Sequence, residues 1–137
     1  MIILDTNVLS EPLRSRPDPS VLSWFTLASK ELWITSVSLG EILTGVMLLP
    51  HGRRRDGLAS AVEATVASFG DRILPYDAAS AREFADVKAG RRAIGEPIST
   101  EDAQIAAICL DRGATLATRN TKDFQNLGLT LIDPWAM

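Results

Sequence analysis

Short strand-like runs alternate along the chain with longer helical patterns, and this alternation constrains the fold more than any other feature. A helix between two strands carries the chain back across the sheet, so that successive strands run parallel. Such sheets are covered by helices on both faces. We therefore expect an α/β fold of three layers, with a central, mainly parallel sheet of four to five strands flanked by helices.

Capping and turn residues set the expected boundaries. Asp18 followed by Pro19 is typical of a helix start, and Gly113 is typical of a helix end. The expected strands are 1–4, 32–35, 73–76, 114–118 and 129–132, and the expected helices are 7–14, 18–29, 39–49, 53–69, 78–93 and 100–112.

Composition places the chain among ordinary globular proteins. Its 137 residues are 46% hydrophobic and 23% charged, which favours one domain over residues 1–137. The net charge of −3 gives no overall basic field, so a nucleic-acid role needs a local basic patch. The single cysteine cannot form an internal disulfide, and no signal peptide or membrane-spanning run is visible. We expect a soluble, cytoplasmic protein without a membrane partner.

Three acidic residues fall at equivalent places in the expected fold. Asp5 ends the first strand in MIILDTN, Glu41 lies in SVSLGEI in the first turn after the second strand, and Asp102 lies in ISTEDAQ before the fourth strand. In a parallel sheet all three positions belong to the rim at the carboxyl ends of the strands, where ligands bind.

Each acid also has a purely structural interpretation. Asp5 could cap a helix, Ser38 to Glu41 has capping-box spacing, and Ser99 to Asp102 is closely related. Carboxylates about 5 Å apart, however, repel by roughly 3 kcal/mol per pair at an effective dielectric near 20. A divalent cation would remove that repulsion, and oxygen ligands favour Mg²⁺ or Mn²⁺.

A polar turn near the C-terminus could complete the rim. A strand ends at Thr118 in ATLATRNTKDF, and Asn120 and Asp123 follow within reach. Asn120 could equally be a plain turn residue, and Asp123 could simply cap the turn.

Four segments in order, DTN, SLGEI, EDAQIAA and LATRNTKDF, resemble PIN-domain ribonucleases over nearly the whole chain. The similarity is greatest to the toxins of VapBC-type toxin–antitoxin pairs, including the FitB-like branch. By position, Asp5, Glu41 and Asp102 match the acidic metal-binding residues of that family. Asn120 stands where many members carry a fourth aspartate, so we expect a single tightly held ion.

The resemblance also implies supporting residues, an activity and partners. Thr6, Asn7 and Thr118 match the polar residues around the acids, and Asp123 stands beside Asn120. The implied function is a Mg²⁺- or Mn²⁺-dependent endoribonuclease, acting on RNA such as tRNA, and serving as toxin of a type II pair. The family implies a homodimer and a DNA-binding antitoxin whose C-terminal segment inhibits the enzyme.

Arginines are the candidate RNA contacts. Arg53 and Arg54 open an expected helix within an HGRRR run, Arg91 precedes the EPIS loop, and Arg119 follows Thr118. A solvated helix start is the alternative interpretation of the RRR run.

Three alternatives remain open. A haloacid-dehalogenase-type phosphohydrolase needs Asp and Thr at the positions that Asn7 and Leu9 occupy, which argues against it. A receiver-like signalling domain could use Asp77 but would leave Glu41 and Asp102 without a role. A catalytically weak or inactive PIN-fold partner-binding module is the third, because Asn120 carries no charge.

Overall fold

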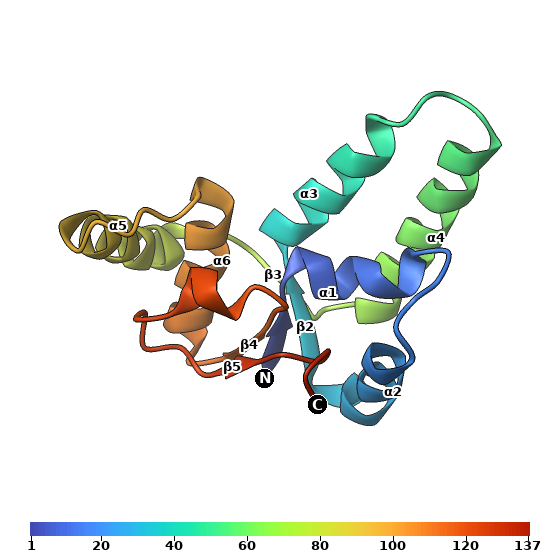
Figure 1. Ribbon diagram of the computed structural model, residues 1–137. Helices are drawn as coiled ribbons and strands as arrows, with labels where there is room; N and C mark the ends of the chain where they lie inside the picture. The colour runs from blue at the N-terminus through green and yellow to red at the C-terminus, as the bar shows by residue number, and fades with distance from the viewer.

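The computed structural model describes all 137 residues and confirms the α/β class. One sheet contains five strands in the order β3-β2-β1-β4-β5, and every neighbouring pair is parallel (Figure 1). The strands are β1 (Ile2–Leu4), β2 (Leu32–Thr35), β3 (Ile73–Leu74), β4 (Thr115–Ala117) and β5 (Leu131–Ile132).

Six α-helices connect or flank the strands, close to the expected ranges. They are α1 (Thr6–Ser10), α2 (Pro19–Ala28), α3 (Ser36–Met47), α4 (Arg53–Phe69), α5 (Ala78–Ala93) and α6 (Thr100–Arg112), with 3₁₀ turns η1 (Glu11–Leu13), η2 (Ser29–Glu31) and η3 (Thr121–Phe124).

Two helix boundaries differ from expectation. The helix expected at 7–14 ends as α1 at Ser10, because Pro12 has no N–H to continue the helical hydrogen bonds and the chain tightens into η1. Helix α3 begins at Ser36, three residues early, because the Thr35 side chain accepts a hydrogen bond from the Ser38 backbone N–H and caps it.

The core has two halves, one on each face of the sheet. Successive residues of β1 point to opposite faces, so Ile3 packs with Ile105 and Ile108 of α6, whereas Leu4 packs with residues of α1 and α2 such as Val8. All of these side chains are buried. Figure 1 shows α5 and α6 on one side of the molecule and α3 and α4 projecting as a pair on the other. We call this pair the α3–α4 arm.

The order of the strands reverses at the centre of the sheet. The chain runs outward from β1 through β2 to β3, and then returns to place β4 on the other side of β1. Ligands of parallel α/β sheets bind outside the carboxyl ends of the strands at such a point. Asp5 and Thr118, which follow β1 and β4, lie there. No helix is long and apolar enough to cross a bilayer.

Candidate active site

Asp5 is the most buried acid of the candidate site, with 5% of its surface exposed. One carboxylate oxygen accepts from the Thr6 backbone N–H (2.8 Å), so Asp5 does cap α1. The other accepts from the Thr118 hydroxyl (2.7 Å) and from the Asn7 side-chain amide (3.3 Å). Burial raises the pKa of this carboxyl above its ordinary value, and these hydrogen bonds offset part of the rise. Asp5 is therefore both the cap of α1 and an acid of the candidate site.

Thr6 joins Asp5 to the acid on α3. Its hydroxyl donates to Glu41 Oε1 (2.9 Å) and lies 3.1 Å from the hydroxyl oxygen of the buried Ser38. Because α3 starts at Ser36, Glu41 lies in the second turn, and the capping-box interpretation of Ser38 and Glu41 is wrong. Partial burial of the carboxyl raises the pKa of Glu41, and the charge of Asp5 adds to the rise. Glu41 is thus free of a capping role.

Asp102 lies in the first turn of α6, where the Ser99 hydroxyl accepts from its backbone N–H (3.2 Å) and caps the helix. Desolvation, followed by the charge of Asp5, raises the pKa of the Asp102 carboxyl to about 6, and the charges of Asp123 and Glu41 contribute. A carboxyl on an ordinary exposed helix start has no such neighbours. Asp5, Glu41 and Asp102 come from three separate parts of the chain, and they lie near enough for the charges of Asp5 and Glu41 to act on the Asp102 carboxyl.

The downstream turn approaches the same site. The Asn120 backbone N–H donates to the Thr118 hydroxyl (3.0 Å), and the Arg119 N–H contacts Asn7 Oδ1 (3.4 Å). The side chain of Asn120 is exposed and caps nothing. Asp123 lies inside η3 and so does not cap it, while its charge raises the pKa of both Asp5 and Asp102.

One expected RNA contact is wrong. Arg91 is 5% exposed, and its guanidinium donates to the backbone carbonyls of Asp123 (2.7 Å), Gln125 (2.7 Å) and Glu96 (3.3 Å). Every partner is a backbone carbonyl and the Arg91 side chain itself is buried, so this arginine holds the turn after η3 and has no face for a phosphate. The sequence places Arg91 in a run of two arginines but does not tell which one faces inward.

The other three candidate arginines are exposed. Arg53 and Arg54 begin α4 at the outer end of the arm, and Arg119 lies over the Trp135 ring at 5.0 Å. They remain candidate RNA contacts.

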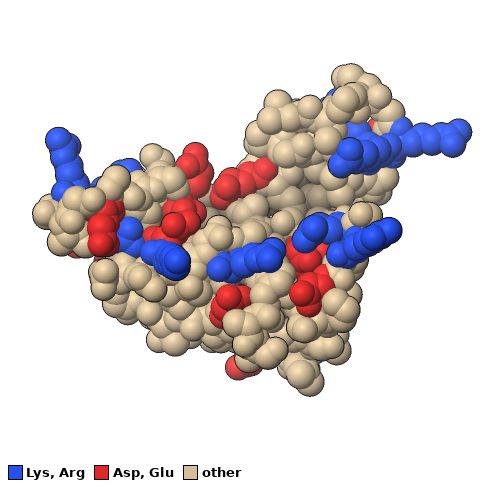
Figure 2. Space-filling model, in the orientation of Figure 1, with Lys and Arg blue, Asp and Glu red and all other residues tan.

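The acids carry no compensating cation from the protein. The two ion pairs of the chain join Arg14 to Glu11 and Arg112 to Asp111, away from the candidate site. Figure 2 shows acidic side chains at the edge of a hollow in this face of the molecule. Uncompensated carboxylates with raised pKa values, all oxygen donors, fit a hard divalent cation. No three of them yet converge on one ion-sized position, so exposed Glu41 and half-buried Asp102 would have to rotate inward.

The family model described as "PIN domain" matches residues 2–128. The chain belongs to the PIN-domain family. The phosphohydrolase and receiver alternatives are therefore wrong, because neither is a PIN domain.

Related PIN proteins match the chain over nearly its whole length. Plasmid stability protein StbB of Pseudomonas syringae pv. tomato is 40% identical over 98% of this chain and 99% of its own length. VapC ribonuclease Y4jK of Sinorhizobium fredii is 36% identical over 98% of each protein. The crystal structure of FitAcB from Neisseria gonorrhoeae has a TM-score of 0.92 and 33% identity, with complete coverage of both chains. The resemblance to VapC and FitB proteins is thereby confirmed.

Two contributors to this PIN-domain site were missed from the sequence. Ser38 contacts the Thr6 hydroxyl, and Glu101 lies near enough for its charge to raise the pKa of Glu41. Glu101 directly precedes Asp102 in ISTEDAQ, and the sequence alone did not show that both acids face the site. Ser38 could have been found once Thr35 was recognised as the helix cap.

Proposed function

We propose that this PIN domain is a Mg²⁺- or Mn²⁺-dependent endoribonuclease that acts as the toxin of a type II toxin–antitoxin pair. The observation that carries the proposal is the uncompensated group of Asp5, Glu41 and Asp102 at the switch point of the sheet. Relatives that cover the whole chain are named VapC ribonuclease and Toxin FitB, and a less similar one is a tRNA(fMet)-specific endonuclease.

In the proposed phosphodiester hydrolysis, some side chains would bind the ion and others would orient those ligands. Asp5, Glu41 and Asp102 would hold the ion, which when bound supplies an activated water and neutralises charge on the attacked phosphate. Thr118 and Asn7 orient the Asp5 carboxylate through their hydrogen bonds. Thr6 holds one oxygen of Glu41, which leaves the second oxygen available.

Asn120, which is uncharged, bears on how many metal ions the site could hold and on whether it is active. Its side chain is exposed and uncharged, whereas the charge of Asp123 raises the pKa of both Asp5 and Asp102. Three acids with one amide favour a single tightly held ion over two. The same neutrality supports the second candidate function, a catalytically weak or inactive PIN-fold module that only binds a partner.

The relatives support the proposed partners. Related structures are described as FitAB bound to a DNA fragment and as DNA-bound VapBC from Salmonella typhimurium. By analogy, a DNA-binding antitoxin would inhibit this chain by placing its C-terminal segment over the acids, and the toxin would act in the cytoplasm as a homodimer.

Incubation of the purified protein with tRNA and other RNAs tests the proposal. Cleavage should require Mg²⁺ or Mn²⁺ and stop in EDTA. Asp5→Asn and Asp102→Asn should each lower the rate at least roughly a hundredfold, more than loss of a supporting contact. Asp111→Asn, at the opposite end of α6, is the matched control and should cut normally.

The variants must be shown to fold by circular dichroism. Equal cutting by wild type and Asp102→Asn, or cutting that persists in EDTA, would refute the metal-dependent assignment. A folded wild type that cuts no RNA with either ion, but binds an antitoxin, would establish the partner-binding module instead.

A further inference from the structure

The loop between α5 and α6 leads directly into the helical turn that carries Asp102. Its own backbone hydrogen bonds lie at its beginning, where the N–H groups of Gly95 and Glu96 donate to carbonyls in the last turn of α5 at 3.1 and 3.0 Å. Pro97, which follows, has no N–H to donate. The second half of this loop is therefore held by side chains.

Lys88 of α5 holds the end of the loop. Its Nζ donates to the backbone carbonyl of Ile98 at 2.8 Å. The Ile98 side chain is buried in a small apolar cluster with Val87 and Ala103. Apolar burial anchors a side chain without direction, whereas a hydrogen bond also orients the carbonyl that accepts it. Lys88 therefore fixes the orientation of the peptide group that joins Ile98 to Ser99.

Further hydrogen bonds connect this peptide group to the acid. Ser99 is the N-cap of α6, and its hydroxyl accepts from the Asp102 backbone N–H at 3.2 Å. The Ser99 carbonyl accepts from the Ala103 N–H at 2.9 Å and so begins the helical bonding of α6. Lys88 thus acts on the peptide group just before the cap, and the cap acts on the backbone of Asp102. A shift of that peptide group would move the base of the Asp102 side chain.

Neither ion pairing nor apolar packing accounts for a lysine at position 88. Lys88 takes part in neither of the two ion pairs of the chain, and its side chain is half-buried. An ammonium group loses hydration when it is partly buried, and one carbonyl without a carboxylate offsets only part of that cost. An apolar side chain would pack beside Val87 and Ile98 without the cost. The directed bond to the Ile98 carbonyl is therefore what lysine adds here.

We propose that Lys88 is a positioning residue of the metal site: by fixing the Ile98 carbonyl, it sets the start of α6 and holds Asp102 where this acid can bind the ion. The inference rests on the proposed function, because it needs a divalent cation bound by Asp102. Mg²⁺ demands near-ideal octahedral geometry, and its ligands must be held within about 0.5 Å of the productive position. Lys88 acts through the backbone of α6 and not by contact with the ion.

Mn²⁺ binding measured without RNA tests this inference. The electron paramagnetic resonance signal of free Mn²⁺ falls as the protein binds the ion, so the Kd is obtained without any cleavage. Lys88→Met keeps the apolar stem and removes the donor. It should raise the Kd for Mn²⁺ about tenfold, as expected when a group that orients a metal ligand is lost. Lys88→Arg can donate to the same carbonyl and should restore most of the affinity.

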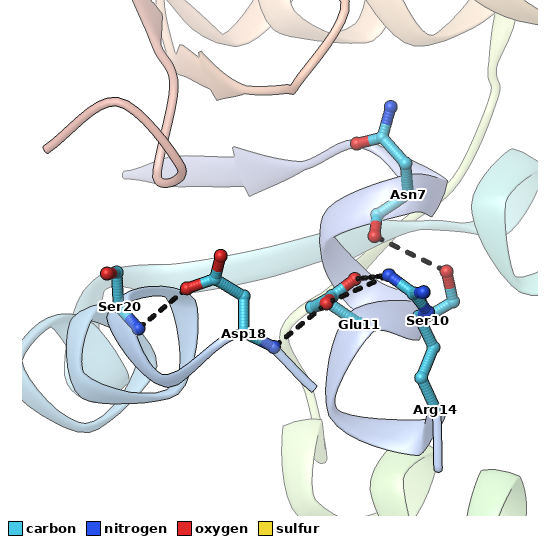
Figure 3. A network of polar contacts seen from close by, with 6 residues as sticks. All are labelled: Asn7, Ser10, Glu11, Arg14, Asp18 and Ser20. Atoms are coloured by element: carbon cyan, nitrogen blue, oxygen red, sulfur yellow. Dashed lines mark hydrogen bonds and ion pairs between the residues drawn. The ribbon is translucent and has the colours of Figure 1, made fainter. Parts of the chain in front are cut away.

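Two control variants separate positioning from loss of charge and from loss of stability. Lys30→Met removes the same charge from an exposed position after α2. Asp18→Ala removes the side chain that caps α2 by accepting from the Ser20 backbone N–H at 2.8 Å, while the Asp18 backbone N–H is held by the buried Glu11 (Figure 3). Asp18→Ala should lower the urea unfolding midpoint. Because α2 carries none of the acids, both controls should bind Mn²⁺ as wild type does.

Amide hydrogen exchange followed by NMR in EDTA gives a second measurement on the folded protein. The Asp102 amide, which Ser99 caps, should exchange faster in Lys88→Met than in wild type or Asp18→Ala. If Lys88→Met does not fold, Lys88→Gln takes its place, because its neutral side chain is one bond shorter, and it must show the same loss of Mn²⁺ affinity.

A folded Lys88 variant that lacks the donor but keeps the wild-type Kd for Mn²⁺ would overturn the inference. So would equal losses of affinity in Lys88→Met and Asp18→Ala, which would show a general effect of lowered stability. A wild-type protein that binds no Mn²⁺ would contradict the metal site and this inference together. The expected changes in Mn²⁺ binding, found in a protein that cuts no RNA, would support the inference and contradict the nuclease function alone.

Discussion

Asp5 shows how one residue serves folding and the site together. Its first oxygen caps α1 and its second is held by Thr118 and Asn7, so the carboxylate is fixed before any ligand arrives. An amide in its place would keep the cap but would have one acceptor where Asp5 has two. Asp102 is different, because burial is the largest cause of the raised pKa of its carboxyl and the charge of Asp5 is the next. The two aspartates should therefore respond differently to neutralisation.

The Asp102 carboxyl should make stability fall with rising pH in metal-free protein. Its pKa is raised from 3.8 to about 6, so the folded state binds the proton more tightly than the unfolded chain does. Its favourable contribution is complete below about pH 4 and is lost as the pH rises through about 6. Asp102→Asn should therefore gain roughly 1–2 kcal/mol relative to wild type between pH 4 and 7, a value reduced for solvent screening of a half-buried group. Urea unfolding in EDTA measures this, and a pH-independent difference would contradict it.

Thr118→Val should destabilise the fold by about 1–3 kcal/mol. The change keeps the shape of the buried side chain but removes the donor to Asp5 and the acceptor for the Asn120 N–H. Thr115→Val, in β4 just before Thr118, is the control, because the Thr115 hydroxyl forms no such contacts, and it should change stability little. Chemical denaturation compares the two; equal midpoints would show that the Thr118 hydroxyl holds nothing.

At the scale of helices and strands, the sequence predicted the type of each element correctly but misplaced some of the boundaries between them. The pattern of apolar runs located all five strands and six helices, because each element is amphipathic or apolar over its own length. The start of α3 was misplaced because Thr35 belongs to a strand by its composition and becomes a cap only through its backbone geometry. The acids were found because strand ends and helix starts are local features.

The inward turn of Arg91 could not be found in the same way, since its partners lie 32 and 34 residues downstream. The local sequence pattern does not tell which of two adjacent arginines will donate hydrogen bonds to a turn far along the chain. The same holds for Glu11, whose burial depends on the path of the following loop.

Arg91→Met should cost about 2–3 kcal/mol of stability, because three backbone carbonyls lose a partly buried donor. Nuclease activity should fall with it, since the turn that these bonds hold carries Asp123 beside the acids. Arg92→Met, on the exposed neighbour, is the control for the loss of charge and should keep both properties. Unfolding curves and RNA cleavage assays decide; a stable, active Arg91→Met protein would contradict the assigned clamp.

At the scale of the molecule, charges of both signs lie around one hollow. On the face drawn in Figure 2, acidic side chains lie near the centre, and basic side chains lie on either side of the hollow. The net charge of −3 hides this division. A polyanion is attracted by the edges and repelled at the centre until a cation is present, so the ion and the RNA should support each other's binding.

Metal should stabilise the whole fold at neutral pH. A hundredfold excess of Mg²⁺ or Mn²⁺ over its Kd adds about 2.7 kcal/mol if only the folded state binds it. Thermal unfolding at pH 7 should therefore shift upward on adding the ion, and the shift should shrink below about pH 6 as Asp102 takes up a proton. Asp102→Asn should lose most of the shift, and an undiminished shift in that variant would place the ion elsewhere.

The bond between Asp5 and Thr118 spans 113 residues of sequence. A growing chain on the ribosome therefore carries Asp5 well before it has made the hydroxyl that fixes this carboxylate, because 113 residues separate the two. At about 5–20 residues per second, that delay lasts several seconds. Any activity of the site must therefore wait until the segment that carries Thr118 has been made and has folded against β1.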